Sequence, residues 1–94
     1  MLKNMTMNNL YIRSQDGFCL TNDLNLTINK TKSATGYIFR IENTHNILGV
    51  YGNLSKAMEV MKDIETGIND GFAIYHMPPD CEVGKWKYTK INST

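Results

Sequence analysis

Side chains able to do chemistry are few in this sequence, and their spacing favours binding over catalysis. Nucleophilic catalysis needs a Ser or Cys beside a His and an orienting acid. The only histidines are His45, in an expected turn, and His76, and neither adjoins a nucleophile motif. Cys19 and Cys81 stand far apart, without the CxxC spacing of a zinc or redox site. We therefore expect a protein that is not an enzyme and has no metal site and no cofactor.

Arginine is scarce, because the ten Lys and Arg side chains include only two arginines, Arg13 and Arg40. A guanidinium forks onto phosphates and planar acceptors in a way that a lysine does not. Together with Gln15 and Asp16, the two arginines could converge as groups that bind phosphate and read a base. The alternative is that an arginine on the polar face of a sheet is solvated or pairs with an acid such as Glu42.

Size and charge exclude several classes of protein. The chain has 94 residues, a net charge of +1, 41% hydrophobic and 20% charged residues, which is typical of one globular domain. This nearly neutral balance disfavours general nucleic-acid binding. We find no apolar leader and no window long enough to span a membrane, so we expect a cytoplasmic protein. The basic and aromatic run 85–90 suits nucleotide stacking, although a solvated terminal strand has the same composition.

Hydrophobic periodicity predicts several short strands in the first half of the chain. Asp16-Gly17 separates two apolar runs and signals a hairpin, so the first two strands should be antiparallel neighbours. The small polar residues of 30–36 are expected to form a loop. The expected strands span 10–13, 18–20, 24–29, 37–42 and 47–51.

A change of period then predicts an amphipathic helix. Apolar residues fall at helical spacing from Leu54 to Ile68, and charged residues including Asp63 are assigned to the opposite side. Candidate caps are Asn53 or Ser55 at the start, and Gly67 or Gly71 at the end.

These elements predict one α+β domain. A return strand over 72–77 should end at Pro78-Pro79, which cannot pair normally. We expect an antiparallel β-meander of about four to five strands, with one amphipathic helix packed on it and a C-terminal extended segment. The organisation is a loosely ordered leader over 1–8, a single domain over 9–79 and a basic and aromatic segment of the same domain over 80–94.

Three short segments carry a resemblance to a known family. They are Ile12-Arg13-Ser14-Gln15-Asp16-Gly17, then Ile47-Leu48-Gly49-Val50-Tyr51 leading into Ala57, Val60 and Ile64, then Tyr75-His76-Met77-Pro78. In this order they resemble small phage and prophage proteins of Gram-positive bacteria, most of all the first-described class of Thoeris anti-defence proteins. Members of that class have an N-terminal antiparallel sheet followed by helices. This chain departs from the class in having one clear helix and an unusual C-terminal segment.

The resemblance implies immune evasion by sequestration. Proteins of the class are sponges that bind a cyclic ADP-ribose-type signal between subunits and do not change it. For this chain the resemblance implies a homo-oligomer that binds a cyclic nucleotide in the host cytoplasm. A sponge needs cationic donors for two phosphates and an aromatic or amide edge for the base. The residues with that chemistry in the resembling region are Arg13, Gln15, Arg40, Tyr51 and Tyr75.

A protein partner is the competing expectation. An anti-CRISPR or anti-restriction inhibitor is also small and non-catalytic, and it would cover a host defence enzyme with a sheet face, an edge strand or a tail. The absence of a strongly acidic composition argues only against a DNA mimic. A purely assembly role in a phage or mobile element is a third possibility.

Overall fold

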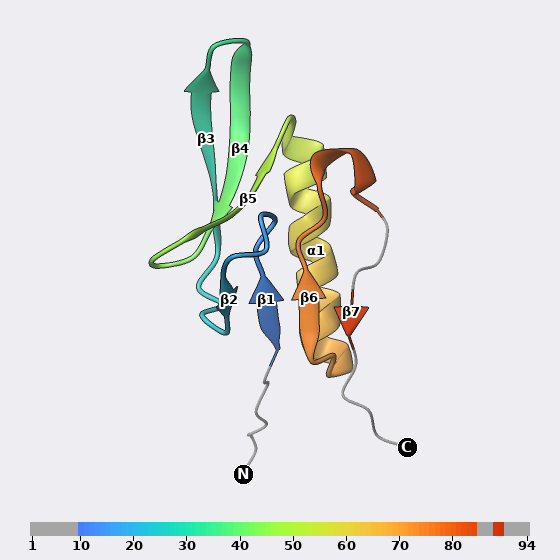
Figure 1. Ribbon diagram of the computed structural model, residues 1–94. Helices are drawn as coiled ribbons and strands as arrows, with labels where there is room; N and C mark the ends of the chain where they lie inside the picture. Colours follow the sequence, from blue (N-terminus) through green and yellow to red (C-terminus); the bar gives the residue numbers. More distant parts are fainter. Residues whose placement is uncertain (1–9, 85–87, 90–94) are drawn as a thin grey trace.

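The computed structural model describes residues 10–84 and 88–89, and it confirms an α+β fold of strands packed against one helix (Figure 1). The leader expected over 1–8 lies outside the described residues, as does most of the expected segment 85–90. The strands form two sheets, with the orders β2-β1-β6-β7 and β3-β4-β5. The elements are β1 (Tyr11–Arg13), β2 (Leu20–Thr21), β3 (Thr27–Ser33), β4 (Gly36–Glu42), β5 (Ile47–Tyr51), α1 (Leu54–Asp70), β6 (Ile74–His76), the 3-10 turn η1 (Asp80–Glu82) and β7 (Tyr88–Thr89).

The first sheet joins the start of the chain to its end. β1 pairs with β2 in antiparallel orientation, as expected. β1 also pairs with β6, and this pairing is parallel, so the strands do not follow one continuous meander. The physical reason is the helix, because α1 carries the chain back along the sheets before β6 begins, as in other parallel crossovers. Periodicity within a strand does not reveal this pairing.

The second sheet is a meander of three antiparallel strands with β4 in the centre. The loop expected over 30–36 is wrong, because β3 continues to Ser33 and only Ala34 and Thr35 separate it from β4. The far half of this hairpin projects beyond β5 (Figure 1). Both of its faces meet water, so the polar residues of 30–33 can form a strand without an apolar side.

The helix α1 begins and ends at residues that the sequence offered as candidates. The Asn53 side chain accepts a hydrogen bond from the backbone N–H of Lys56, with an N···O distance of 2.8 Å. Gly71 follows the last turn in the left-handed conformation, with φ 74°, which glycine adopts without steric cost. Asp63 lies on the buried side of α1 rather than on the charged side where the sequence placed it.

One core lies between α1 and both sheets. Figure 1 shows β6 passing in front of α1, and α1 also contacts β4 and β5. All ten core side chains are at most 4% exposed. They are Leu10, Ile12, Ile41, Leu48, Tyr51, Ala57, Val60, Ile64, Tyr75 and Met77.

Candidate binding face

The side of the sheets that faces away from α1 is the candidate site, and we call it the helix-free face. Side chains alternate along a strand. Because Ile12 is buried in the core, its neighbours Tyr11 and Arg13 lie on the opposite face of β1. In β4, Ile41 is buried in the core, so Arg40 and Glu42 lie on the opposite face. Both arginines of the sequence therefore lie on the helix-free face.

Arg13 lies between two neighbouring strands on this face. Its Cα partners are Leu20 in β2 and His76 in β6, and cross-strand partners share a face. Its Nη1 donates a hydrogen bond of 3.2 Å to the carbonyl oxygen of Gly17. Among the described residues it has no carboxylate partner. The guanidinium therefore keeps donors for a further acceptor.

Arg40 is already paired. Its Nε lies 2.8 Å from Oε2 of Glu42, and the other carboxylate oxygen of Glu42 accepts a 2.9 Å hydrogen bond from Nδ2 of Asn29. This arrangement is the alternative that the sequence left open for an arginine on a sheet face. A ligand at Arg40 would have to compete with Glu42.

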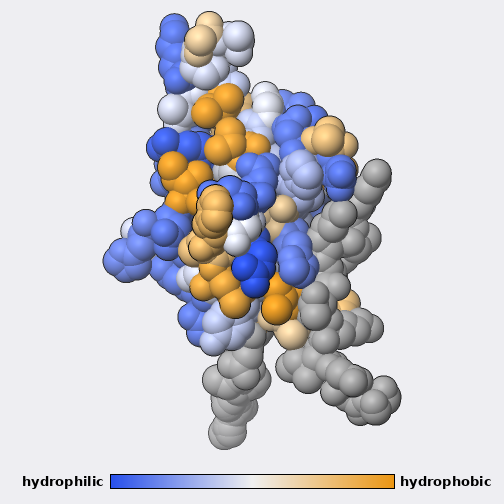
Figure 2. Space-filling model, in the orientation of Figure 1, coloured by the Kyte–Doolittle hydropathy of each residue, from blue (hydrophilic) through white to orange (hydrophobic). Residues whose placement is uncertain are grey.

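Exposed apolar side chains lie on the strands next to those that carry the two arginines. Figure 2 shows them as a broken orange band over the strands on this side of the molecule. Leu20 and Ile47 are 46% and 50% exposed, and Phe18, in the loop between β1 and β2, is 93% exposed. The sequence pattern did not single out these residues as candidates. In β1 the exposed Tyr11 lies on the same face as Arg13 because side chains alternate along the strand. Clustered exposed apolar residues commonly mark interaction surfaces.

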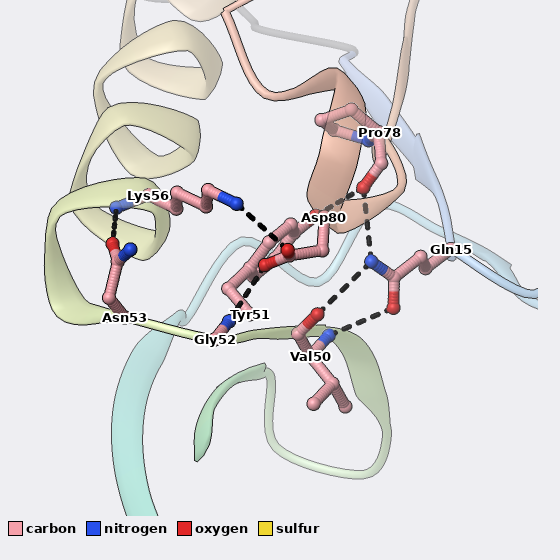
Figure 3. Close-up of polar contacts among 8 residues, drawn as sticks. All are labelled: Gln15, Val50, Tyr51, Gly52, Asn53, Lys56, Pro78 and Asp80. Atoms are coloured by element: carbon pink, nitrogen blue, oxygen red, sulfur yellow. Dashed lines mark hydrogen bonds and ion pairs between the residues drawn. The ribbon is translucent and has the colours of Figure 1, made fainter. Parts of the chain in front are cut away.

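Gln15 joins the two sheets instead of facing a ligand (Figure 3). Its Nε2 donates hydrogen bonds to the carbonyl oxygens of Val50 and Pro78, at 3.2 and 3.1 Å. Its Oε1 accepts a 3.0 Å hydrogen bond from the backbone N–H of Val50. Both amide donors are therefore in use within the fold.

Tyr51 and Tyr75 are both 0% exposed. The Tyr51 hydroxyl donates a 2.8 Å hydrogen bond to the carbonyl oxygen of Pro78, and burial, with a smaller effect of the Asp80 charge, raises the pKa of Tyr51. Tyr75 is hydrogen-bonded to Asp63. The rings form part of the core, so the structure does not bring them together with the arginines on the surface.

The described residues contain little other chemistry. They include no group of three or more His, Cys, Asp and Glu side chains that could hold a metal ion. Cys19 and Cys81 are free thiols. No helix in the described part of the chain is long and apolar enough to cross a membrane.

Comparisons with known proteins found no match to this chain among family models, curated proteins or solved structures. The resemblance to Thoeris anti-defence proteins therefore stays a prediction, and the helix-free face is the ground for a functional proposal.

Proposed function

We propose that this chain is a non-catalytic binding protein that docks on another protein through its helix-free face. The observation that carries the proposal is the set of exposed apolar side chains in β1, β2, β5 and the loop after β1, together with Arg13, a guanidinium without a carboxylate partner in the described structure. Aromatic residues and arginine are enriched in protein interfaces and dominate their binding energy.

The resemblance supplies the kind of partner. If the chain is a phage-type anti-defence protein, the partner is a defence enzyme in the host cytoplasm, and binding covers a surface that the enzyme needs. Inhibition would follow from occlusion, so it would be stoichiometric and would leave both proteins chemically unchanged.

The test is inhibition of a panel of purified CRISPR and restriction enzymes by wild type and by variants. We expect one enzyme to be inhibited at a one-to-one ratio, and Phe18→Ser or Ile47→Ser to weaken binding about tenfold or more, as loss of an interface anchor does. Leu54→Ser is the matched control, because Leu54 is 46% exposed on α1, away from the helix-free face. The proposal fails if no enzyme is inhibited, or if all three variants act alike.

Sequestration of a cyclic nucleotide is the second candidate function. Its support is that Arg13 and Arg40 lie on the same face and that His76 is the cross-strand neighbour of Arg13. Because Gln15, Tyr51 and Tyr75 are engaged inside the fold, one copy offers few ligand contacts. A second copy would have to complete the site, as in the class that the sequence resembles.

Native mass spectrometry with cyclic dinucleotides and cyclic ADP-ribose isomers tests this candidate. The expected result is a homo-oligomer that gains one ligand per interface, loses it in Arg13→Ala, and releases it unaltered after denaturation. Lys62→Ala removes an exposed cation from α1 and should bind as wild type does. A spectrum without adducts, or a chemically altered ligand, would reject sequestration.

A further inference from the structure

β3 is an edge strand of seven residues, Thr27–Ser33. It pairs with β4 on one side, and no described strand lies on the other. An uncovered edge presents backbone N–H and C=O groups that can pair with another strand. The strand contains no proline and no bulge along β4 that would blunt this edge. Two exposed lysines, Lys30 and Lys32, are its only charges.

An apolar groove of about 1050 Å³ adjoins the segment that leads into this strand. On one side lie Leu24, Leu26 and Ile28, which are half-buried while the residues between them are exposed. On the other side lies α1, where residues three or four apart share a stripe. The stripe that lines the groove consists of Met58, Met61, Glu65 and Ile68.

The strand and the groove carry opposite charges. The chain has no acidic residue between Asp23 and Glu42, so the β3–β4 hairpin is cationic. The groove is lined by three acidic residues, Glu59, Asp63 and Glu65, and by one lysine, Lys62. A surface that carries both a cationic strand and its acidic, apolar receptor is self-complementary about a twofold axis.

We propose that two copies of this chain pair through their β3 strands, antiparallel and about a twofold axis. The product is a continuous sheet in the order β5-β4-β3-β3-β4-β5, with each α1 groove facing the strand of the partner copy. Pairing satisfies the free edges, and it covers the apolar groove that a single copy leaves open to water.

Charge restricts the register of the pairing. Ile28, Lys30 and Lys32 alternate with other residues and so share one face of β3. A twofold axis at Lys30 would place that residue opposite its copy, and an axis at Thr31 would place Lys30 opposite Lys32. Directly opposed like charges destabilise a strand pair. An axis at Asn29 instead pairs residues 27–31 of β3 with those of the other copy. It places Lys30 and Lys32 opposite Ile28 and Leu26 of that copy, which line the groove together with its Glu65.

Sedimentation equilibrium and native mass spectrometry of the full chain test the pairing. We expect a dimer that dissociates on dilution. Lys32→Glu and Glu65→Lys should each raise the dissociation constant on the order of tenfold, because symmetry turns two attractive contacts into repulsive ones. The double variant carries the swapped pair and should recover most of the affinity. Asp70→Lys makes the same charge change at an exposed site on α1 and should leave the dimer intact.

Each outcome decides the proposal. A protein that is monomeric at all concentrations overturns it, and so does a dimer that ignores both charge reversals. A double variant weaker than either single one also overturns it. Circular dichroism of each variant is the control that it is folded. The pairing uses a different surface from the helix-free face, so Phe18→Ser should leave the dimer unchanged, and either proposal can fail without the other.

Discussion

At the residue scale, the Asp63 carboxyl is an acidic group on the buried side of α1. It is only 8% exposed. Burial raises its pKa above the ordinary value of 3.8, the nearby Glu59 charge raises it further, and the hydrogen bond to Tyr75 partly opposes both. The charged form is therefore disfavoured in the folded state, where water solvates it poorly.

The sign of the resulting pH effect follows by linkage. Because the folded pKa is raised, the folded state binds the Asp63 proton more tightly than the unfolded state does. The stability that this proton contributes is present below the unfolded pKa, and it is lost as pH rises through the folded one. Asp63→Asn cannot lose this proton. We therefore expect the free energy of unfolding of wild type to fall relative to that of Asp63→Asn as pH rises.

Urea denaturation of both proteins between about pH 3.5 and pH 7 measures this difference. Asp70→Asn removes an exposed charge from the same helix and serves as the control. A gap between wild type and Asp63→Asn that does not change with pH would contradict the prediction. The comparison is made between variants because hydrogen bonds lower the pKa values of Asp16, Asp23 and Asp80, which changes stability in the opposite direction.

At the element scale, α1 depends on local interactions at both ends. Asn53 accepts a backbone hydrogen bond at the first turn, and Gly71 supplies the left-handed residue after the last. Asp80 reinforces the start from outside the helix, because Oδ1 accepts a 2.7 Å hydrogen bond from the Gly52 N–H and Oδ2 lies 2.8 Å from Nζ of Lys56 (Figure 3). The first turn is thereby joined to the 3-10 turn η1.

The two candidate caps make a matched experiment. Asn53→Ala removes the cap and should lower the free energy of unfolding by about 1 kcal/mol. Ser55→Ala changes an exposed residue inside the helix and should be neutral or slightly stabilising, because alanine is the better helix former. Thermal and urea unfolding measure both, and equal losses in the two variants would contradict the assignment of Asn53 as the cap.

At the scale of the whole molecule, two small sheets act as one body because they share α1 and the contacts of Gln15. The backbone N–H of Gln15 donates a 2.7 Å hydrogen bond to the Leu48 carbonyl, which extends the loop after β1 along the edge of β5. Its side chain also forms hydrogen bonds with Val50 and Pro78. This one residue of the loop after β1 therefore contacts both the second sheet and the segment after β6. These hydrogen bonds of Gln15 keep the two sheets, and with them the two parts of the helix-free face, side by side.

Gln15→Ala should therefore destabilise the whole fold. It leaves the Val50 N–H and the carbonyls of Val50 and Pro78 without these partners, which costs about 2–3 kcal/mol. Asn29→Ala removes an exposed amide that bonds to Glu42 and should cost less than about 0.5 kcal/mol. Urea denaturation gives both values, and similar losses for the two variants would show that Gln15 does not join the sheets.

The elements that depend on neighbouring residues were predictable. The helix, the first hairpin and the strands β4 and β5 follow from spacing and turn chemistry within short windows. For each helix cap the sequence left two candidates, and the structure decided for Asn53 and Gly71. The strand β3 was only partly predictable, because its solvent-facing half has the polar composition of a loop. The structure places Arg13 and Arg40 on the strand faces opposite the buried Ile12 and Ile41, and their expected role in ligand binding stays a prediction.

The contacts of Gln15, Tyr51 and Tyr75 depended on residues far along the chain. Gln15 bonds to residues 35 and 63 positions away, and Tyr51 to one 27 positions away. A tyrosine or glutamine has the same chemistry in a core as in a binding site, so composition does not distinguish the two. The sequence by itself determined the local elements and the α+β class, because hydrogen bonds and hydrophobic periodicity act over a few residues. Only the tertiary structure decided the parallel pairing of β1 with β6, the hydrogen bonds of Gln15 and Tyr51, and which face of the sheets the helix leaves uncovered. These features depend on which distant segments of the chain pack together and exclude water.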